Sequence, residues 1–184
     1  MFHKDRFVEA CAAAVGEGQK AIREVVLEAV ADPAGVIAAL GAPDTAGVYP
    51  LHQSDDLTVI NFVWAPYMTI MPHNHEMWAV ISMYTGREDN VFWRRVDDGE
   101  GGRIEAAGAK ALSVRYVSPL GKDIIHSVTN PIPRLSGAIH VYGGDFFSIA
   151  RSEWDAETLV ESPYDVAKNM KLFEDFGRMT GGEH

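Results

Sequence analysis

The stretch Leu57-Thr-Val-Ile-Asn-Phe-Val-Trp64 is typical of a β-strand, because most of its residues are β-branched or aromatic. Further runs of the same kind follow it, each bounded by proline, glycine or aspartate: Met77–Tyr84, Asn90–Val96, Ala111–Val117, Ile124–Val128 and Gly137–Tyr142. The glycine-rich segment Asp97–Gly102 predicts the tip of a hairpin. Six or more short strands at this spacing predict a β-sandwich or a small barrel.

Helical patterns flank these strands. Between Asp5 and about Leu40, apolar residues recur at spacings of three and four, which predicts two or three short helices with Cys11 packed on their apolar face. After Trp154 the same spacing returns and predicts one more helix. We find no repeat and no linker. We therefore expect a single domain, 1–184, made of a helical N-terminal segment (1–45), a barrel (46–150) and a C-terminal extension with a helix (151–184).

Composition narrows the classes of function. Of the 184 residues, 47% are apolar and 23% are charged, which is typical of one compact globular domain. A single cysteine excludes a disulfide framework and a cysteine-rich metal site, and it fits a reducing compartment. No apolar stretch reaches the roughly 18 residues of a membrane span. With 16 basic and 26 acidic residues the net charge is −10, so nucleic acid is an unsuitable partner. We expect a cytoplasmic protein without a membrane partner.

The placement of the seven histidines is the most informative feature of the chain. His73 and His75 lie in Met71-Pro-His-Asn-His-Glu-Met-Trp78, just ahead of a strand. On a strand, side chains at i and i+2 project from the same face about 6.6 Å apart, so two imidazoles can turn toward one cation. His126 supplies a third candidate ligand, in Ser118-Pro-Leu-Gly-Lys-Asp-Ile-Ile-His-Ser-Val-Thr-Asn130. Three further histidines stand outside any pattern, and we expect them to be exposed or hydrogen-bonded: His3, His52 and His184.

The order of these residues resembles the two signature motifs of the cupin superfamily. The resemblance covers roughly residues 46–150 and rests on the following positions: His73, His75, Gly86, Pro119, Gly121, His126 and Asn130. It implies a mainly β chain folded as a double-stranded β-helix, that is, a cupin-like jelly-roll barrel with N-terminal helices and a C-terminal helix. In that fold the two motifs lie on facing strands and hold a metal ion in the barrel mouth, here through His73, His75 and His126.

One departure from the cupin pattern concerns the fourth ligand. Cupins usually place a glutamate four or five residues after the second histidine, where this chain has Ala79 and Val80. Glu76 is not a substitute, because adjacent residues of a strand face opposite sides. A site of three histidines remains. It resembles the thiol dioxygenase branch, that is, cysteine dioxygenase and 3-mercaptopropionate dioxygenase, and more closely an uncharacterised group of predicted metal-dependent enzymes beside that branch.

A second match points to the same branch. Ala138-Ile-His-Val-Tyr142 places His140 and Tyr142 on one face of a strand and resembles the Ser-x-His-x-Tyr group beside the iron of thiol dioxygenases, with Ala138 in place of the serine. This implies a mononuclear non-haem Fe(II) dioxygenase, a cysteine-dioxygenase-like oxidoreductase that oxidises a small thiol or similar chelating metabolite with O₂. His140 and Tyr142 would be its catalytic residues. The missing serine hydroxyl leaves the orientation of the His140 ring open.

Other departures bear on the substrate. No Lys or Arg lies between Tyr49 and Trp64, where cysteine dioxygenase holds the carboxylate of its substrate, and Val80 stands where some members have a cross-linked cysteine. Free cysteine is therefore a poor candidate. Four arginines are candidates for binding an anion: Arg87, Arg94, Arg95 and Arg115. Four side chains are candidates for an apolar pocket wall: Trp64, Met77, Trp78 and Trp93.

Three neutral imidazoles on one side of a metal leave its opposite face open to substrate and O₂. Fe(II) suits such a site, while Zn with a bound water would give a hydrolytic site, and Ni, Mn or Cu are also compatible. The alternatives to a dioxygenase are therefore another metal-dependent cupin enzyme, such as a hydrolase, lyase or isomerase, and a non-catalytic barrel that binds a metal or small molecule. The resemblance leaves a homodimer open.

Overall fold

The computed structural model describes residues 1–96 and 103–181 of the chain. Three helices and a short 3₁₀ helix precede the strands, and one helix follows them: α1 (Lys4–Ala14), η1 (Val15–Glu17), α2 (Gln19–Val30), α3 (Pro33–Leu40) and α4 (Val166–Thr180). The strands are β1 (Gly47–Gln53), β2 (Thr58–Trp64), β3 (Thr69–His73), β4 (Ala79–Thr85), β5 (Arg87–Arg95), β6 (Ile104–Ser113), β7 (Val117–Leu120), β8 (Ile125–Thr129), β9 (Ser136–Tyr142), β10 (Ser152–Trp154) and β11 (Glu161–Pro163). Among the described helices, none is long and apolar enough to cross a membrane.

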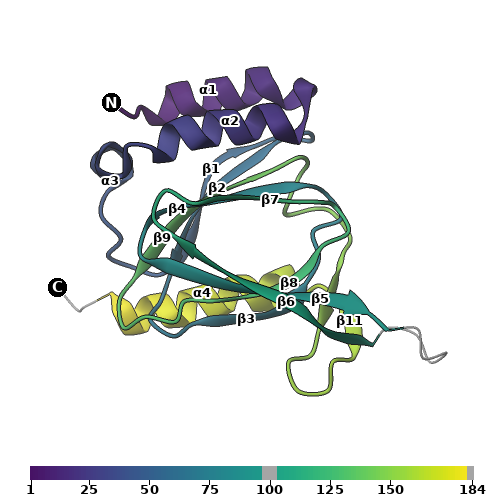
Figure 1. Cartoon of the computed structure of the whole chain (residues 1–184). Helices are drawn as coiled ribbons and strands as arrows, with labels where there is room; N and C mark the ends of the chain where they lie inside the picture. Colours follow the sequence, from purple (N-terminus) through teal and green to yellow (C-terminus); the bar gives the residue numbers. More distant parts are fainter. Residues whose placement is uncertain (97–102, 182–184) are drawn as a thin grey trace.

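The strands form two antiparallel sheets that face each other (Figure 1). The first has the order β1-β2-β9-β4-β7, and the second has the order β11-β10-β3-β8-β5-β6. From β2 to β9 the chain passes repeatedly from one sheet to the other, and these eight strands pair as β2-β9-β4-β7 and β3-β8-β5-β6. This is the strand pairing of a jelly roll, the double-stranded β-helix. The sequence prediction of the fold is confirmed.

The central strands of the first sheet are buried on both faces. Every residue of β2 and β9 is buried. Ile60 and Phe62 contribute to the core between the sheets, whereas Val59 and Val141 pack outward against the N-terminal helices. Most residues of these two strands are therefore apolar, because neither face meets water. Cys11 is fully buried in the outer cluster, as expected, and burial raises its pKa to about 12.

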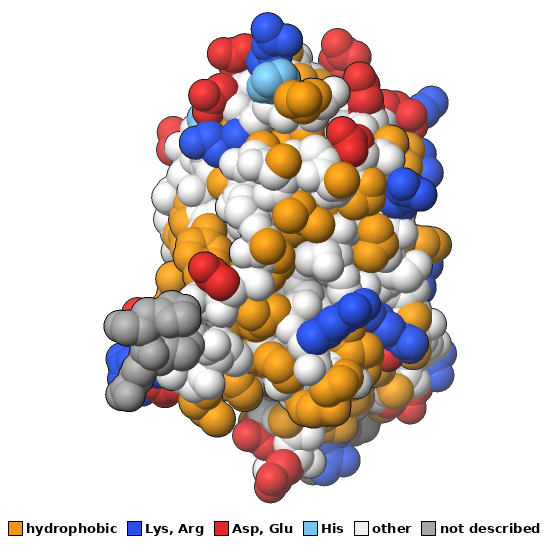
Figure 2. Space-filling view, turned by 90° about the vertical axis from the view of Figure 1, so that its left-hand side faces the viewer, with side chains coloured by type: hydrophobic (Ala, Val, Ile, Leu, Met, Phe, Trp, Pro, Cys, Tyr) orange, Lys and Arg blue, Asp and Glu red, His pale blue; other side chains and the backbone are white. Residues whose placement is uncertain are grey.

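The N-terminal helices form a layer over the first sheet (Figure 1). Gln19 at the start of α2 ties this layer to the sheet, since its side-chain amide donates to the carbonyls of Ala79 and Leu120 at 2.9 and 2.7 Å. On the face shown in Figure 2, charged side chains gather mainly at the top, over these helices, and at the bottom, while the middle is largely hydrophobic or uncharged. The helices thus act as a cover for one wall of the barrel.

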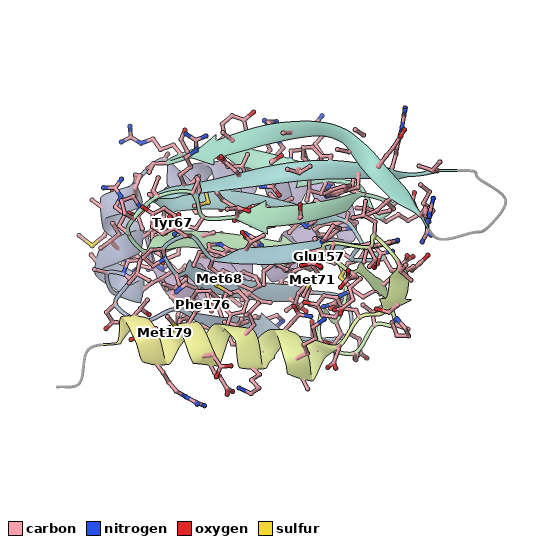
Figure 3. The ribbon with its side chains drawn as sticks, turned by 90° about the horizontal axis from the view of Figure 1, so that it is seen from below. Tyr67, Met68, Met71, Glu157, Phe176 and Met179 are labelled. Atoms are coloured by element: carbon pink, nitrogen blue, oxygen red, sulfur yellow. The ribbon has the colours of Figure 1, made fainter. Side chains whose placement is uncertain are left out.

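Helix α4 lies along the side of the barrel, with Phe176 turned toward the strands (Figure 3). Near its N-terminal end, Lys168 donates to the buried Glu153 of β10 at 2.6 Å. Near its C-terminal end, the Thr180 hydroxyl accepts from the Ala46 amide, just before β1, at 3.2 Å. The helix therefore joins the edge of one sheet to the edge of the other, and Phe173 packs into the core between them.

Some strands differ from the sequence prediction. The run Ala111–Val117 is not one strand, because Arg115 adopts a left-handed conformation (φ 70°) and a turn separates β6 from β7. β1, β3, β10 and β11 were not predicted; β10 and β11 come from the C-terminal extension and join the second sheet. The predicted hairpin tip at 97–102 lies outside the described residues.

Candidate metal centre

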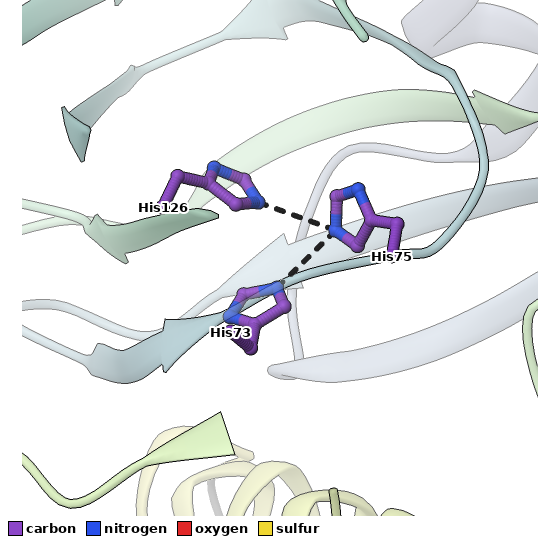
Figure 4. A group of neighbouring side chains, drawn as sticks. All are labelled: His73, His75 and His126. Atoms are coloured by element: carbon purple, nitrogen blue, oxygen red, sulfur yellow. Dashed lines mark hydrogen bonds between the residues drawn. The ribbon is translucent and has the colours of Figure 1, made fainter. Parts of the chain in front are cut away.

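Three buried histidines meet inside the barrel (Figure 4). The Nε2 atom of His75 lies 3.3 Å from Nε2 of His73 and 3.2 Å from Nε2 of His126. One ligand nitrogen from each ring lies within 4.8 Å of the other two. Imidazoles that bind one divalent ion at about 2.0–2.1 Å have their nitrogens roughly 3 Å apart, so this spacing suits a shared ion. The structure thus brings together the three histidines that the sequence singled out as ligands.

The local backbone that presents these histidines differs from the one we expected. His73 is the last residue of β3, and His75 lies in the connection to β4, so the pair does not share a strand. Antiparallel pairing of β3 with β8 instead places His73 directly opposite His126. The intervening Asn74 is buried, donates to Glu76 at 2.7 Å and accepts from the Ser152 amide at 2.8 Å. This bend lets His75 turn back toward the other two rings.

Hydrogen bonds fix the ring tautomers of two ligands. Nδ1 of His73 lies 2.9 Å from the Met71 carbonyl oxygen, which accepts only, so Nδ1 carries the proton and Nε2 has a free lone pair. Nδ1 of His126 lies 2.6 Å from Oδ1 of Asn90 and likewise donates. Both Nε2 lone pairs therefore face the point shared with His75. Converging, unprotonated imidazole nitrogens are a donor set that a divalent metal fits.

The hydrogen bond between Asn90 and His126 belongs to a longer series of buried hydrogen bonds. Asn90 donates from Nδ2 to Oε1 of Glu88 at 2.9 Å, which fixes the amide so that its oxygen faces His126. The other carboxylate oxygen of Glu88 accepts from Nε2 of His140 at 3.2 Å. Nδ1 of His140 in turn lies 3.0 Å from the Tyr142 hydroxyl. Hydrogen bonds thus connect the ligand His126 to His140 and Tyr142 through β5.

This series of hydrogen bonds fixes the orientation of the His140 ring. Ala138 has no hydroxyl to offer the ring, and Glu88, which is fully buried on another strand, accepts from it instead. His140 and Tyr142 point to the same side of β9, as predicted, and the Tyr142 ring lies 5.1 Å from the His75 ring. Burial raises the pKa of the Tyr142 hydroxyl well above its ordinary value, so the phenol is protonated near neutral pH.

Burial also keeps the ligand imidazoles neutral. It lowers the pKa of His73 to about 4, against weaker opposing effects of the Met71 carbonyl and the Glu153 carboxylate. Burial likewise lowers the pKa of His75 and His126 well below 6.5, and the neighbouring imidazoles lower both further. Neutral imidazole is the form that binds a metal.

The histidines open onto a small cavity of about 30 Å³. Its walls are largely aromatic and include Phe62, Trp64, His140, Tyr142, Phe146, Tyr164 and Phe173. Of the predicted wall residues only Trp64 lines it. Met77 packs elsewhere in the barrel core, Trp78 packs beside the outer cluster, and Trp93 donates to Ser127.

None of the four arginines proposed for an anion lies at this cavity. Three form ion pairs on the surface, Arg87 with Asp89, Arg94 with Glu105 and Arg95 with Glu161. Arg115 is exposed in the turn between β6 and β7.

Several motif residues have structural roles. Gly86 has φ 76°, and a Cβ at this position would lie 2.1 Å from Oγ of Ser136. Asn130 donates to the carbonyls of Ala65 and Arg134 at 2.9 and 2.8 Å and thereby fixes two connections. Glu76 is exposed and hydrogen-bonded to Asn74, so it is not a ligand, as predicted.

Sequence reasoning missed several residues of the site, among them Glu88, Asn90, Phe146, Arg151 and Tyr164. Glu88 and Asn90 are spaced by two on β5, and this alternation was the available signal for a shared inward face. The last two lie in the C-terminal extension, which nothing in the sequence pattern connects to the barrel. His3 and His52 lie away from the site, and His184 falls outside the described residues.

No known family model matches the sequence. Among solved structures, the chain is similar to an RmlC-like cupin family protein with a double-stranded β-helix fold from Methanocaldococcus jannaschii, at 8% identity and a TM-score of 0.46, over 57% of this chain and 85% of that chain. It is also similar to a cupin superfamily protein from Desulfitobacterium hafniense, at 15% identity and a TM-score of 0.42, over 53% and 76%. Oxalate oxidase in complex with the substrate analogue glycolate is similar at 12% identity and a TM-score of 0.42, over 56% and 53%. Similarities of this size assign no function to the chain.

Proposed function

We propose that this protein is a metal-dependent enzyme, a mononuclear Fe(II) dioxygenase that oxidises a small thiol or similar chelating metabolite with O₂. The observation that carries the proposal is the convergence of three neutral, buried imidazoles from His73, His75 and His126 on one point. These three residues would hold the iron ion and leave room for other ligands. When bound, the iron would activate both O₂ and the substrate.

The remaining residues of the site supply binding and proton handling. The aromatic wall excludes water, which strengthens every electrostatic interaction at the reacting atoms. Tyr142, protonated near neutral pH, donates a hydrogen bond into the cavity or to His140. Glu88 fixes the His140 ring, so that His140 and Tyr142 form a pair that can hold or pass a proton at the tyrosine oxygen.

The same pair favours a second candidate, a hydrolase or lyase that uses Zn, Ni or Mn. Such an enzyme needs a general base beside the metal, and His140 backed by the Glu88 carboxylate is a suitable one. The two candidates share their ligands and differ in the need for O₂.

The test is O₂ consumption by protein reconstituted anaerobically with Fe(II). We expect substrate-dependent uptake with one member of a panel of thiols and α-hydroxy or α-keto acids, and none from the His126→Ala variant. His52→Ala is the control, because His52 is a histidine outside the site. Absence of uptake with the whole panel, together with turnover of an ester or lyase substrate by the zinc form, would replace the first candidate with the second.

A further inference from the structure

Arg151 is the least expected residue near the metal centre. It lies directly before β10, and hydrogen bonds fix its backbone beside the ligand loop. The Ser152 amide donates to the Asn74 side chain at 2.8 Å, and the Asn74 amide donates to the Ser152 carbonyl at 3.2 Å. The Tyr164 amide donates to the Arg151 carbonyl at 2.8 Å. Arg151 is therefore held next to the residue that separates His73 from His75.

The guanidinium group of Arg151 is buried among aromatic rings. The residue is 7% exposed, and Cζ lies 4.2 Å from the ring centre of Phe146 and 4.0 Å from that of Tyr164. Both rings line the cavity. The Tyr164 ring lies 5.7 Å from the His73 ring, and the Phe146 ring lies 6.1 Å from the His75 ring. A single aromatic ring thus separates the positive charge from each of two candidate ligands, His73 and His75.

The guanidinium interacts with the Phe146 carbonyl and the Tyr164 hydroxyl, but one of its edges is unused. Nη1 donates to the Phe146 carbonyl, but Nε and Nη2 are buried without a hydrogen-bond partner. The nearby carboxylate of Glu153 is already bound by Lys168 and Asn169. Nε and Nη2 form one edge of the guanidinium, which is the edge that binds a carboxylate through two parallel hydrogen bonds. A buried charge without a counter-charge is costly, so the free edge indicates a ligand.

A second unpaired donor lies on the cavity wall. Nε1 of Trp64 is buried without a hydrogen-bond partner, and Trp64 lines the cavity. Oδ1 of Asn169 on α4 is a buried acceptor without a partner, but Asn169 does not line the cavity. The Trp64 indole on the cavity wall and the Arg151 edge, which lies behind the Phe146 and Tyr164 rings, are both unpaired donors. A ligand that complements them carries acceptors and negative charge.

We propose that Arg151 binds the carboxylate group of a small anionic substrate whose other end reaches the metal centre. This inference rests on the proposed function for the role of the metal, and it adds that the substrate is a carboxylate. The cavity of about 30 Å³ has room for only one or two water molecules, so the substrate is a short-chain acid and Tyr164 or Phe173 shifts to admit it.

The test is carboxylate binding by Arg151 variants, with formate, acetate and glycolate as probes and acetamide as a neutral analogue. Binding is followed by the visible spectrum of the Co(II)-loaded protein and by the tryptophan fluorescence of the metal-free protein. We expect Arg151→Met to weaken carboxylate binding by about 10- to 100-fold, which is the loss of charged hydrogen bonds. Arg151→Lys keeps the charge but cannot make two parallel hydrogen bonds, so its affinity for carboxylates should lie between those of the wild type and Arg151→Met.

Arg95→Met is the matched control. Arg95 also lies over an aromatic ring, that of Trp154, and also binds a carboxylate, but at the surface. We expect it to bind the probes as the wild type does. Acetamide should not compete with acetate. Circular dichroism and Co(II) content confirm that each variant is folded.

The outcomes separate this inference from the proposed function. Suppose that the wild type takes up Co(II), but Arg151→Met binds every probe as tightly or acetamide binds as well as acetate. Arg151 then does not bind the substrate carboxylate, and the proposed metal centre is unaffected. If the wild type takes up no Co(II), the proposed function fails, and the fluorescence titrations still decide the role of Arg151. If neither the Co(II) spectrum nor the tryptophan fluorescence shows a saturable change with the three acids up to about 0.1 M, the proposed role of Arg151 is wrong.

Discussion

At the scale of single residues, the site is specified by hydrogen bonds that set which nitrogen of each ring is free. Asn90 is the clearest example, because its side-chain oxygen accepts from Nδ1 of His126 while Glu88 holds its amide. Neither residue touches the shared point of the three ligand nitrogens. Such supporting contacts commonly change metal affinity, since they fix the ring and raise its basicity.

We therefore expect Asn90→Ala to weaken divalent-metal binding by about 10- to 100-fold without unfolding the protein. The measurement is competition with a coloured chelator, using Zn(II) or Co(II). Asn61→Ala is the control, because Asn61 is also buried but accepts from Tyr84 instead. Equal affinity in the Asn90 variant and the wild type would show that the contact does not support the site.

Protonation of the ligands gives a second test at this scale. Burial lowers the pKa of His73 from 6.5 to about 4, so the unfolded chain takes up protons first as the pH falls. The free energy of unfolding of the metal-free protein should therefore fall between pH 6.5 and about 4, by up to about 1.4 kcal/mol per pH unit for this residue. Above pH 6.5 both states are neutral at His73, and no dependence is expected from it.

Urea unfolding of the metal-free protein across this range checks the expectation. The variant His73→Gln removes one titrating group, so its pH dependence should be shallower than that of the wild type by that amount. Parallel curves for the two proteins would mean that His73 is not held neutral by the fold.

At the scale of elements, helix α4 closes the barrel beside the site. Phe173 is 5% exposed, lines the cavity and lies 5.2 Å from the Trp64 ring. We expect Phe173→Ala to lower the free energy of unfolding by about 3 kcal/mol, through lost burial and a new void. Met179 on the same helix is 80% exposed, so Met179→Ala should stay within about 0.5 kcal/mol of the wild type. A similar effect of both substitutions would show that α4 does not pack as described.

The elements also show what sequence patterns can predict. β2 and β9 were predictable because burial of both faces favours the apolar and β-branched residues that mark a strand in the sequence. β10 and β11 were not, because three-residue strands such as Ser152–Trp154 carry too little alternation to be seen. The convergence of His73, His75 and His126 was predictable from their order along the chain, although the strand geometry expected for His73 and His75 was wrong. Arg151 and Glu88 were not, because their positions in the site depend on strand pairing and on the return of the C-terminal extension.

At the scale of the whole molecule, we expect the N-terminal helices to belong to the same folding unit as the barrel. They bury the outward side chains of the first sheet, including Val59, Val80, Ile139 and Val141. We expect a chain that lacks residues 1–45 to aggregate, since a large apolar sheet face would meet water. Size-exclusion chromatography and circular dichroism test this. A monomeric, folded truncated barrel would show that the helical layer is dispensable.

The central question about this protein is whether the three histidines bind one ion. Equilibrium dialysis against Fe(II) or Zn(II), followed by elemental analysis, measures this directly. We predict one divalent ion per chain in the wild type and in His52→Ala, and loss of that ion in His73→Ala, His75→Ala and His126→Ala. Unchanged metal content in all three ligand variants would contradict the assignment of this site.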